Sequence, residues 1–260
     1  MAWVHALLSL ASGGLVGFTL GLVGGGGSML AVPLMVYVVG VRDPHMAIGT
    51  SALAVAVNAM AGLANHARAG NVIWRCGIAF ALAGVVGALA GSSLGKAIDG
   101  QRLLFLFALL MLVVAAAMFR SRGDGGIEGV TCHRENLLRV SGFGLATGGL
   151  SGFFGIGGGF LIVPALIAAT SMPIYRAIGT SLVAVSAFGL TTAANYAVSG
   201  LVDWPLAGTF ILGGLGGTVA GTAASRALSA HKGRLNVLFA AGIVLVAVYM
   251  LYRSWAALKA

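Results

Sequence analysis

The chain alternates long apolar runs with short polar segments over its whole length. Most runs have close to the ~20 residues that a helix needs to cross the hydrocarbon core of a bilayer. They cover residues 4–23, 29–39, 47–65, 74–94, 103–119, 138–154, 160–169, 177–198, 204–224 and 235–252. The pattern predicts an all-α, polytopic integral membrane protein made of about ten helical elements.

The composition supports the membrane assignment. Hydrophobic residues make up 59% of the 260 residues and charged residues only 8%, whereas a soluble domain carries about 25% charged residues. The net charge of +9 would suggest a nucleic-acid partner in a soluble protein. Here the cations lie in short segments between apolar runs, where they orient spans and meet lipid headgroups. We therefore expect the lipid bilayer as surroundings and no nucleic acid as partner.

The second half of the chain repeats the first. Ala47-Ile48-Gly49-Thr50-Ser51 recurs as Ala177-Ile178-Gly179-Thr180-Ser181, and Asn65, Gly70 and Trp74 recur as Asn195, Gly200 and Trp204. We therefore predict two five-element repeats, 1–120 and 137–260, joined by a polar linker at 121–136. Internal duplication of this kind is typical of secondary transporters.

The distribution of Lys and Arg predicts how the repeats are oriented. If every apolar run crosses the membrane, the face that carries the central linker holds most of the cations, which the positive-inside rule assigns to the cytoplasm. The linker 121–136 is then cytoplasmic and both termini are periplasmic. Five crossings per repeat, an odd number, invert the second copy relative to the first.

Glycine-rich breaks precede the two shortest runs. Residues 24–27 are four glycines, and Gly155-Ile156-Gly157-Gly158-Gly159 is the second copy. Unwound backbone is tolerated at membrane depth only where protein or a watery cavity surrounds it. The runs 29–39 and 160–169 resemble half-length helices that start inside the membrane, where a helix N-terminus favours an anion. The alternative is that the glycines only allow close helix packing.

The repeated motifs supply the remaining candidate residues for this anion site. The backbone N–H groups at the breaks would bind the substrate, helped by the Thr and Ser hydroxyls of the repeated motif and by the two repeated asparagines. The hydroxyls could instead cap the helix that begins there, and the asparagines could satisfy a turn. The substrate-binding set is Gly25, Gly26, Gly27, Ser28, Met29, Thr50, Ser51, Asn65, Gly157, Gly158, Gly159, Phe160, Thr180, Ser181 and Asn195. His66 and Arg176 are candidates for a gating or proton-linked role, although such residues more often lie at the membrane interface.

The fourth run of each half carries a small residue at every fourth position. The two stripes are Ala79, Ala83, Gly87, Gly91, Gly95 and Thr209, Gly213, Gly217, Gly221, Ser225. Such a stripe lets helix backbones approach closely. It predicts tight packing within the chain, with a sliding surface or a homodimer contact as the alternative.

The chemistry that the sequence lacks narrows the function. All six acids fall in predicted loops, whereas cation pumps and metal carriers need carboxylates within the membrane. Cys76 and Cys132 lack the spacing of a CxxC pair and are predicted to be free thiols. We therefore expect no metal site, no cofactor and no enzymatic activity.

The paired glycine-rich breaks followed by Pro, the paired Ala-Ile-Gly-Thr-Ser and the Gly200–Trp204 loop resemble the sulfite exporter TauE/SafE family. The resemblance covers residues from about 10 to 255. It implies an inner-membrane permease for a small sulfur-containing anion such as sulfite or an organosulfonate, working without ATP. A passive anion channel, or a non-transporting membrane subunit or enzyme, is the alternative.

Overall fold

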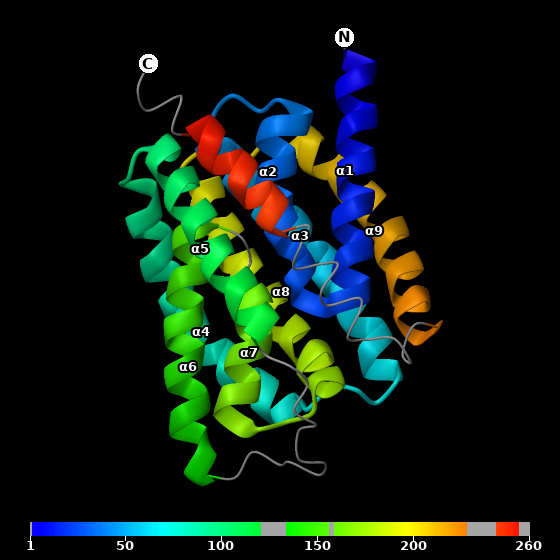
Figure 1. Cartoon of the computed structure of the whole chain (residues 1–260), viewed down its shortest axis with the longest axis vertical. Helices are drawn as coiled ribbons and strands as arrows, with labels where there is room; N and C mark the ends of the chain where they lie inside the picture. Colours follow the sequence, from blue (N-terminus) through cyan, green and yellow to red (C-terminus); the bar gives the residue numbers. More distant parts are fainter. Residues whose placement is uncertain (1, 121–133, 156–158, 228–242, 255–260) are drawn as a thin grey trace.

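In the computed structural model the described residues are 2–120, 134–155, 159–227 and 243–254, and they form helices joined by short connections (Figure 1). The first half contains α1 (Ala2–Val23), the 3-10 helix η1 (Gly24–Leu30), the short α2 (Ala31–Pro33), the π-helix η2 (Leu34–Val39), α3 (Pro44–Arg68), α4 (Trp74–Lys96) and α5 (Gly100–Arg120). The second half contains α6 (Arg134–Phe154), α7 (Gly159–Thr170), α8 (Ile174–Val198) and α9 (Trp204–Ala227), followed by the helix Ile243–Ser254.

The chain is a multi-pass membrane protein. Five of its described helices are long and apolar enough to cross a bilayer. They are Trp3–Leu22, Pro44–Arg68, Trp74–Lys96, Ile174–Val198 and Trp204–Ala224. The predicted all-α class is confirmed, because no strand occurs among the residues that the structure describes.

The two halves run in opposite directions. The start of α3 lies beside the end of α4, since the Nε2 atom of His45 is 3.1 Å from the backbone oxygen of Ile98. The start of α8, by contrast, lies beside the start of α4, since the N–H of Ile73 donates to the Thr180 hydroxyl at 2.9 Å. Helix α3 therefore runs antiparallel to α4, and α8 runs parallel to it, so α3 and α8 point in opposite directions. Because α3 and α8 occupy equivalent places in their repeats, the second half is inverted relative to the first. The start of α1 and the end of the helix Ile243–Ser254 lie at the same end of the bundle, near η2, and α6 begins at the other end (Figure 1).

The halves are interlocked rather than side by side. The first helix of each half packs along the fourth helix of the other half, as α1 on α9 and α6 on α4, while α3 packs on α8. Gly217 and Gly221 bring α9 against the backbone of Gly14 and Phe18 in α1. Gly91 brings α4 equally close to α6. The small-residue stripes therefore serve packing within the chain, as the first of the two interpretations predicts.

Backbone conformations repeat along with the packing. Gly40 ends η2 at φ 86°, and its counterpart Ser171 ends α7 at φ 58°. Gly70 and Gly200 follow α3 and α8 at φ 70° and 71°. A left-handed residue at each equivalent position shows that the duplication extends to the backbone.

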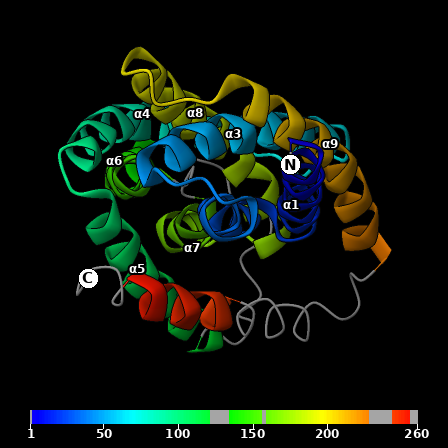
Figure 2. The ribbon, with the colours of Figure 1, turned by 90° about the horizontal axis from the view of Figure 1, so that it is seen from above.

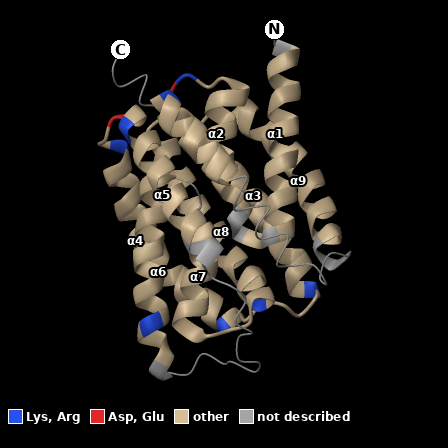
Figure 3. Ribbon diagram, in the orientation of Figure 1, with Lys and Arg blue, Asp and Glu red and all other residues tan. Residues whose placement is uncertain are grey.

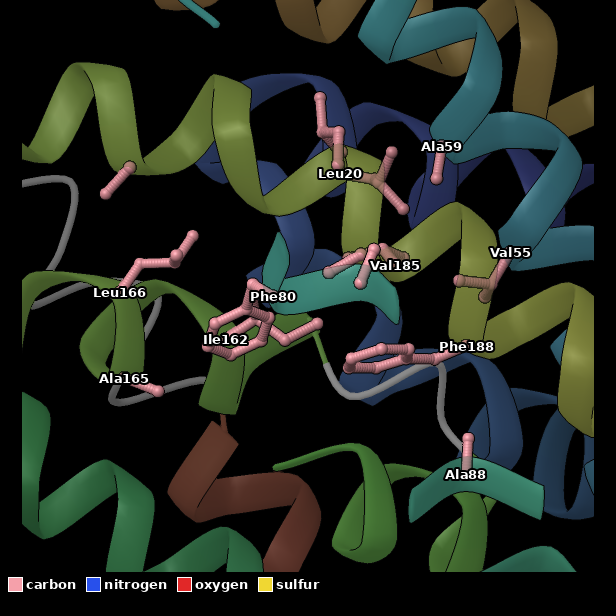
Figure 4. Packing of buried hydrophobic residues seen from close by; sticks show 14 of the residues in the cluster. Leu20, Val55, Ala59, Phe80, Ala88, Ile162, Ala165, Leu166, Val185 and Phe188 are labelled. Carbon is pink, nitrogen blue, oxygen red and sulfur yellow. The ribbon is translucent and has the colours of Figure 1, made fainter. Parts of the chain in front are cut away.

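The core of the molecule lies where the halves meet. Phe80 of α4 and Phe188 of α8 stack at a centroid distance of 6.2 Å, and Ile162 of α7 lies close to Phe80 (Figure 4). This apolar cluster also includes Val55 of α3 and Leu20 of α1. It joins elements of both repeats into one core.

One expectation from the sequence is wrong, and others concern residues that the structure does not describe. Cys76, near the start of α4, is disulfide-bonded, so the prediction of a free thiol is wrong for this residue. Cys132 and most of the predicted linker 121–136 lie outside the described residues. The boundaries of the two repeats therefore stay a prediction.

Candidate functional site

The first glycine break is a tight, buried turn. Gly24 has φ 74°, and Gly25 and Gly26 continue into the 3-10 helix. Gly27 lies directly on the backbone of Thr19 and Leu20, so a side chain at Gly27 would collide with α1. The Thr19 hydroxyl is hydrogen-bonded to the backbone oxygen of Val16 at 2.9 Å and lies 3.5 Å from that of Gly27. The next two residues, Ser28 and Met29, are also buried.

The second break also begins with a left-handed glycine. Gly155 has φ 67° at the end of α6. Gly157 and Gly158 lie outside the described residues. Gly159 and Phe160 begin α7 and are buried, and Phe160 shares an apolar cluster with Met29 of the first break.

Both short elements lie at the centre of the bundle. Viewed from above, α7 and the chain of the first short element are surrounded by the longer helices (Figure 2). Helix α7 contacts η1 directly. With 12 residues, α7 is about 18 Å long, roughly half of what a span needs. The predicted half-length elements are therefore present and adjacent.

Each glycine turn packs on the repeated motif of the opposite half. Gly24 lies against Ile178, and Gly155 lies against Ile48. The structure thus forms two related clusters, each containing one glycine turn and one Ile-Gly-Thr-Ser motif. No spacing within the sequence indicates this exchange between the halves.

The glycine and threonine of each motif hold a loop of the other half. A side chain at Gly49 would collide with the backbone oxygen of Leu201, and one at Gly179 with that of Asn71. The Thr50 hydroxyl accepts a hydrogen bond from the N–H of Asp203 at 3.0 Å, as Thr180 does from Ile73. The predicted capping of their own helix is wrong, because α3 begins at Pro44 and α8 at Ile174. Each threonine instead accepts from the residue that precedes the fourth helix of the other half.

The serines of the motifs bond within their own helices. Ser51 donates to the backbone oxygen of Ile48 at 3.1 Å, and Ser181 donates to that of Ile178 at 2.8 Å. Both side chains are buried. In this conformation the hydroxyl protons are directed at helix carbonyls, so donation to an anion requires rotation about χ1.

Asn195 belongs to a polar network between the halves. Its Oδ1 atom accepts from Lys96 at 2.9 Å, and its amide nitrogen donates to Ser92 and Ser93 at 2.6 and 3.1 Å. Lys96 also donates to Ser199 at 2.8 Å. The network ties the end of α4 to the end of α8. The sequence analysis did not include Lys96 in the candidate site. Lys96 falls on the membrane face that is predicted to carry fewer Lys and Arg residues, and this unusual position could have marked it as a candidate.

The other candidates lie at the opposite end of the bundle. Asn65 is half-buried and His66 is buried on the last turn of α3. Arg176 is half-buried on the first turn of α8, two residues before the isoleucine that meets Gly24. Asn65 and Asn195 therefore lie at opposite ends of the molecule and belong to different clusters.

The described charges lie near the ends of the bundle (Figure 3). Asp43, Asp99 and Asp203 each accept a hydrogen bond from backbone N–H groups at the start of a helix. Within the described part of the chain, no group of three His, Cys, Asp or Glu side chains could hold a metal ion. The central region thus combines glycine turns and hydroxyls with apolar side chains.

Comparison with known proteins gives one consistent result. The model of the family described as "Sulfite exporter TauE/SafE" matches residues 9–250. A probable membrane transporter protein of Xylella fastidiosa (strain Temecula1) is 54% identical over 258 residues, 98% of both chains. Another, YunE of Bacillus subtilis, is 23% identical over 264 residues, 93% of this chain and 96% of the relative. No solved structure matches. These names describe membrane transport rather than an enzyme.

Proposed function

This chain belongs to the sulfite exporter TauE/SafE family, and on that premise we propose that it is a secondary transporter of a small sulfur-containing anion. The substrate class comprises sulfite and organosulfonates. The membrane is the bacterial inner membrane, with the linker 121–136 in the cytoplasm and both termini in the periplasm.

The central position of the two glycine turns carries the proposal. Each turn precedes a short element inside the bundle, and the N-terminus of a helix favours a negative charge through its N–H groups and its dipole. The described acids lie at the ends of helices rather than beside the turns. This arrangement suits an anion better than a cation, which would need carboxylates within the membrane.

The burial of the turns supports alternating access rather than an open pore. Gly27 and Ser28 of the first turn and Gly159 and Phe160 of the second are buried in this structure. A substrate can reach them only when the surrounding helices move. The interlocked pairs α1–α9 and α4–α6 are natural rigid units for such a movement, because their backbones are in close contact.

Flux of radiolabelled sulfite into proteoliposomes tests the proposed function. The wild type should show saturable uptake and counterflow, since a carrier holds its substrate in one site. Ser28→Ala and Ser181→Ala each remove a hydroxyl from the proposed site and should raise KM about tenfold, the effect of losing one hydrogen bond to a charged ligand. Gly158→Leu adds a large side chain to the second glycine-rich break and should abolish flux.

Ser141→Ala on α6 is the matched control and should transport as the wild type does. Unchanged kinetics in all three site variants would remove the site assignment while leaving the transport function intact. Uptake without saturation or counterflow would instead indicate a passive channel. Absence of flux for sulfite and for sulfonates would contradict the proposed function itself.

A further inference from the structure

A cavity of about 370 Å³ opens at the end of the molecule where η2 and the helix Ile243–Ser254 end. Its polar lining consists of Arg42, Arg253, Gln101 and Tyr37, and Gly40 lies at its edge. These residues belong neither to the glycine turns nor to the repeated motifs. The cavity is therefore distinct from the proposed transport site.

Three distant parts of the chain converge to form this cavity. Tyr37 of η2 packs edge-on against Tyr249 at a ring distance of 5.3 Å, and its hydroxyl lies 3.4 Å from the Ser254 hydroxyl. These contacts hold the helix Ile243–Ser254 beside η2, so that Arg253 and Arg42 both line the cavity. Gly40 turns the chain at φ 86°, and among the described residues a Cβ atom there would meet only the ring of His5 within 4 Å.

The neighbouring acids are engaged with backbone N–H groups and form no ion pair with either arginine among the described residues. An oxygen of Asp43 accepts from the N–H of His45 at 2.9 Å, and one of Asp99 accepts from the N–H groups of Gln101 and Arg102 at 3.1 Å. Both carboxylates thus serve as helix caps. Within the described residues, neither Arg42 nor Arg253 forms an ion pair or a side-chain hydrogen bond.

Two like charges in one cavity repel each other unless an anion lies between them. A guanidinium group presents a planar fork of N–H donors that matches the oxygens of sulfate and phosphate groups. The Gln101 amide and the Tyr37 hydroxyl add neutral donors on the remaining sides. Val36 and Val41 line the rest of the cavity and would contact an apolar part of the ligand.

We propose that this cavity is a binding site for a tetrahedral oxyanion, held between Arg42 and Arg253. The ligand is either a free ion or the phosphate group of an anionic lipid, and both present the same chemistry to the two arginines. The proposal does not depend on the identity of the transported anion.

Thermal unfolding of the full chain in an uncharged detergent tests the site. One arm adds inorganic sulfate at constant ionic strength, and the other adds phosphatidylglycerol against phosphatidylcholine of the same acyl chains. At least one probe should raise the unfolding midpoint of the wild type. In Arg42→Gln and in Arg253→Gln, the concentration needed for half of that shift should rise about tenfold, because each variant loses a charge-assisted contact.

Arg102→Gln is the matched control, because Arg102 is an exposed arginine next to Gln101 that does not line the cavity. It should respond to the probes as the wild type does. A sulfate response identifies a free ion and a phosphatidylglycerol response a lipid headgroup, and either one supports the site. The proposal is overturned if neither probe acts, if R42Q and R253Q respond like the wild type, or if R102Q loses as much as they do. Sulfite flux in the same variants reports on the transport function separately.

Discussion

At the scale of single residues, the Thr180 hydroxyl stabilises the first turn of a helix in the other half of the chain. Thr180→Val keeps the shape of the side chain but removes the acceptor for the Ile73 N–H. We expect it to lower the free energy of unfolding by about 1 kcal/mol, the cost of leaving a partly buried donor unpaired. Thr180→Ser should retain most of the stability. Denaturant or thermal unfolding in detergent measures both, and equal stability of T180V and wild type would contradict this role of the hydroxyl.

The sequence predicts these threonines as functional or capping residues because their motif is repeated, but it does not identify their partners. Thr50 and Asp203 are 153 positions apart, and Thr180 and Ile73 are 107 apart. Contacts over such separations depend on how helices cross. Lys96 was missed for the same reason, since its acceptors lie near the end of α8.

At the scale of elements, close contact between α1 and α9 depends on which face of α9 carries glycine. A side chain at Gly217 would meet the backbone of Gly14 and Phe18, whereas no described residue lies within 4 Å of a Cβ atom at Gly216. Gly217→Leu should therefore destabilise the protein by about 3 kcal/mol or more, because the two backbones must separate. Gly216→Leu on the adjacent, open face should stay within about 0.5 kcal/mol of the wild type.

Unfolding midpoints and the yield of monodisperse protein in detergent measure this difference. Similar losses in G217L and G216L would show that helix propensity, rather than contact with α1, controls stability here. The periodicity of four predicted the stripe, because small residues at that spacing share one helix face. It did not predict that the partner is the first helix of the other repeat.

The short elements were predicted in length but not in internal form. The first one passes from a 3-10 turn through one α-helical turn into a π-helix, while the second is α-helical from Gly159 to Thr170 despite Pro164. The two glycine-rich breaks differ in composition, with Ser28 in one and Gly159 in the other. Local packing decides between such closely related helix types, and the sequence carries little direct signal of it.

At the scale of the whole molecule, inversion of the repeats predicts opposite exposure for equivalent helix ends. Ala69→Cys lies just after α3 and Val198→Cys at the end of α8, and both positions are exposed. By the distribution of Lys and Arg, the end of α8 faces the periplasm and the end of α3 the cytoplasm. A membrane-impermeant maleimide should therefore label V198C in intact cells and A69C only after permeabilisation.

The unmodified chain serves as the blank for Cys76 and Cys132. Labelling of A69C but not V198C in intact cells would reverse the orientation while preserving the inverted architecture. Labelling of both would contradict the inversion. The Lys and Arg distribution predicts the orientation, whereas the hydrogen bonds of Ile73 and Asp203 to the opposite repeat establish the inverted packing.

The sequence by itself determined that the chain is a membrane protein, that it is duplicated, and that two of its elements are half-length. These properties follow from hydrophobicity, repetition and the backbone preferences of glycine, all of which are local. Only the tertiary structure decided that each glycine turn rests on the motif of the other half, and that Arg42 and Arg253 share a cavity. Those pairings depend on the packing of distant helices, which is set by the shapes of whole faces rather than by any short segment.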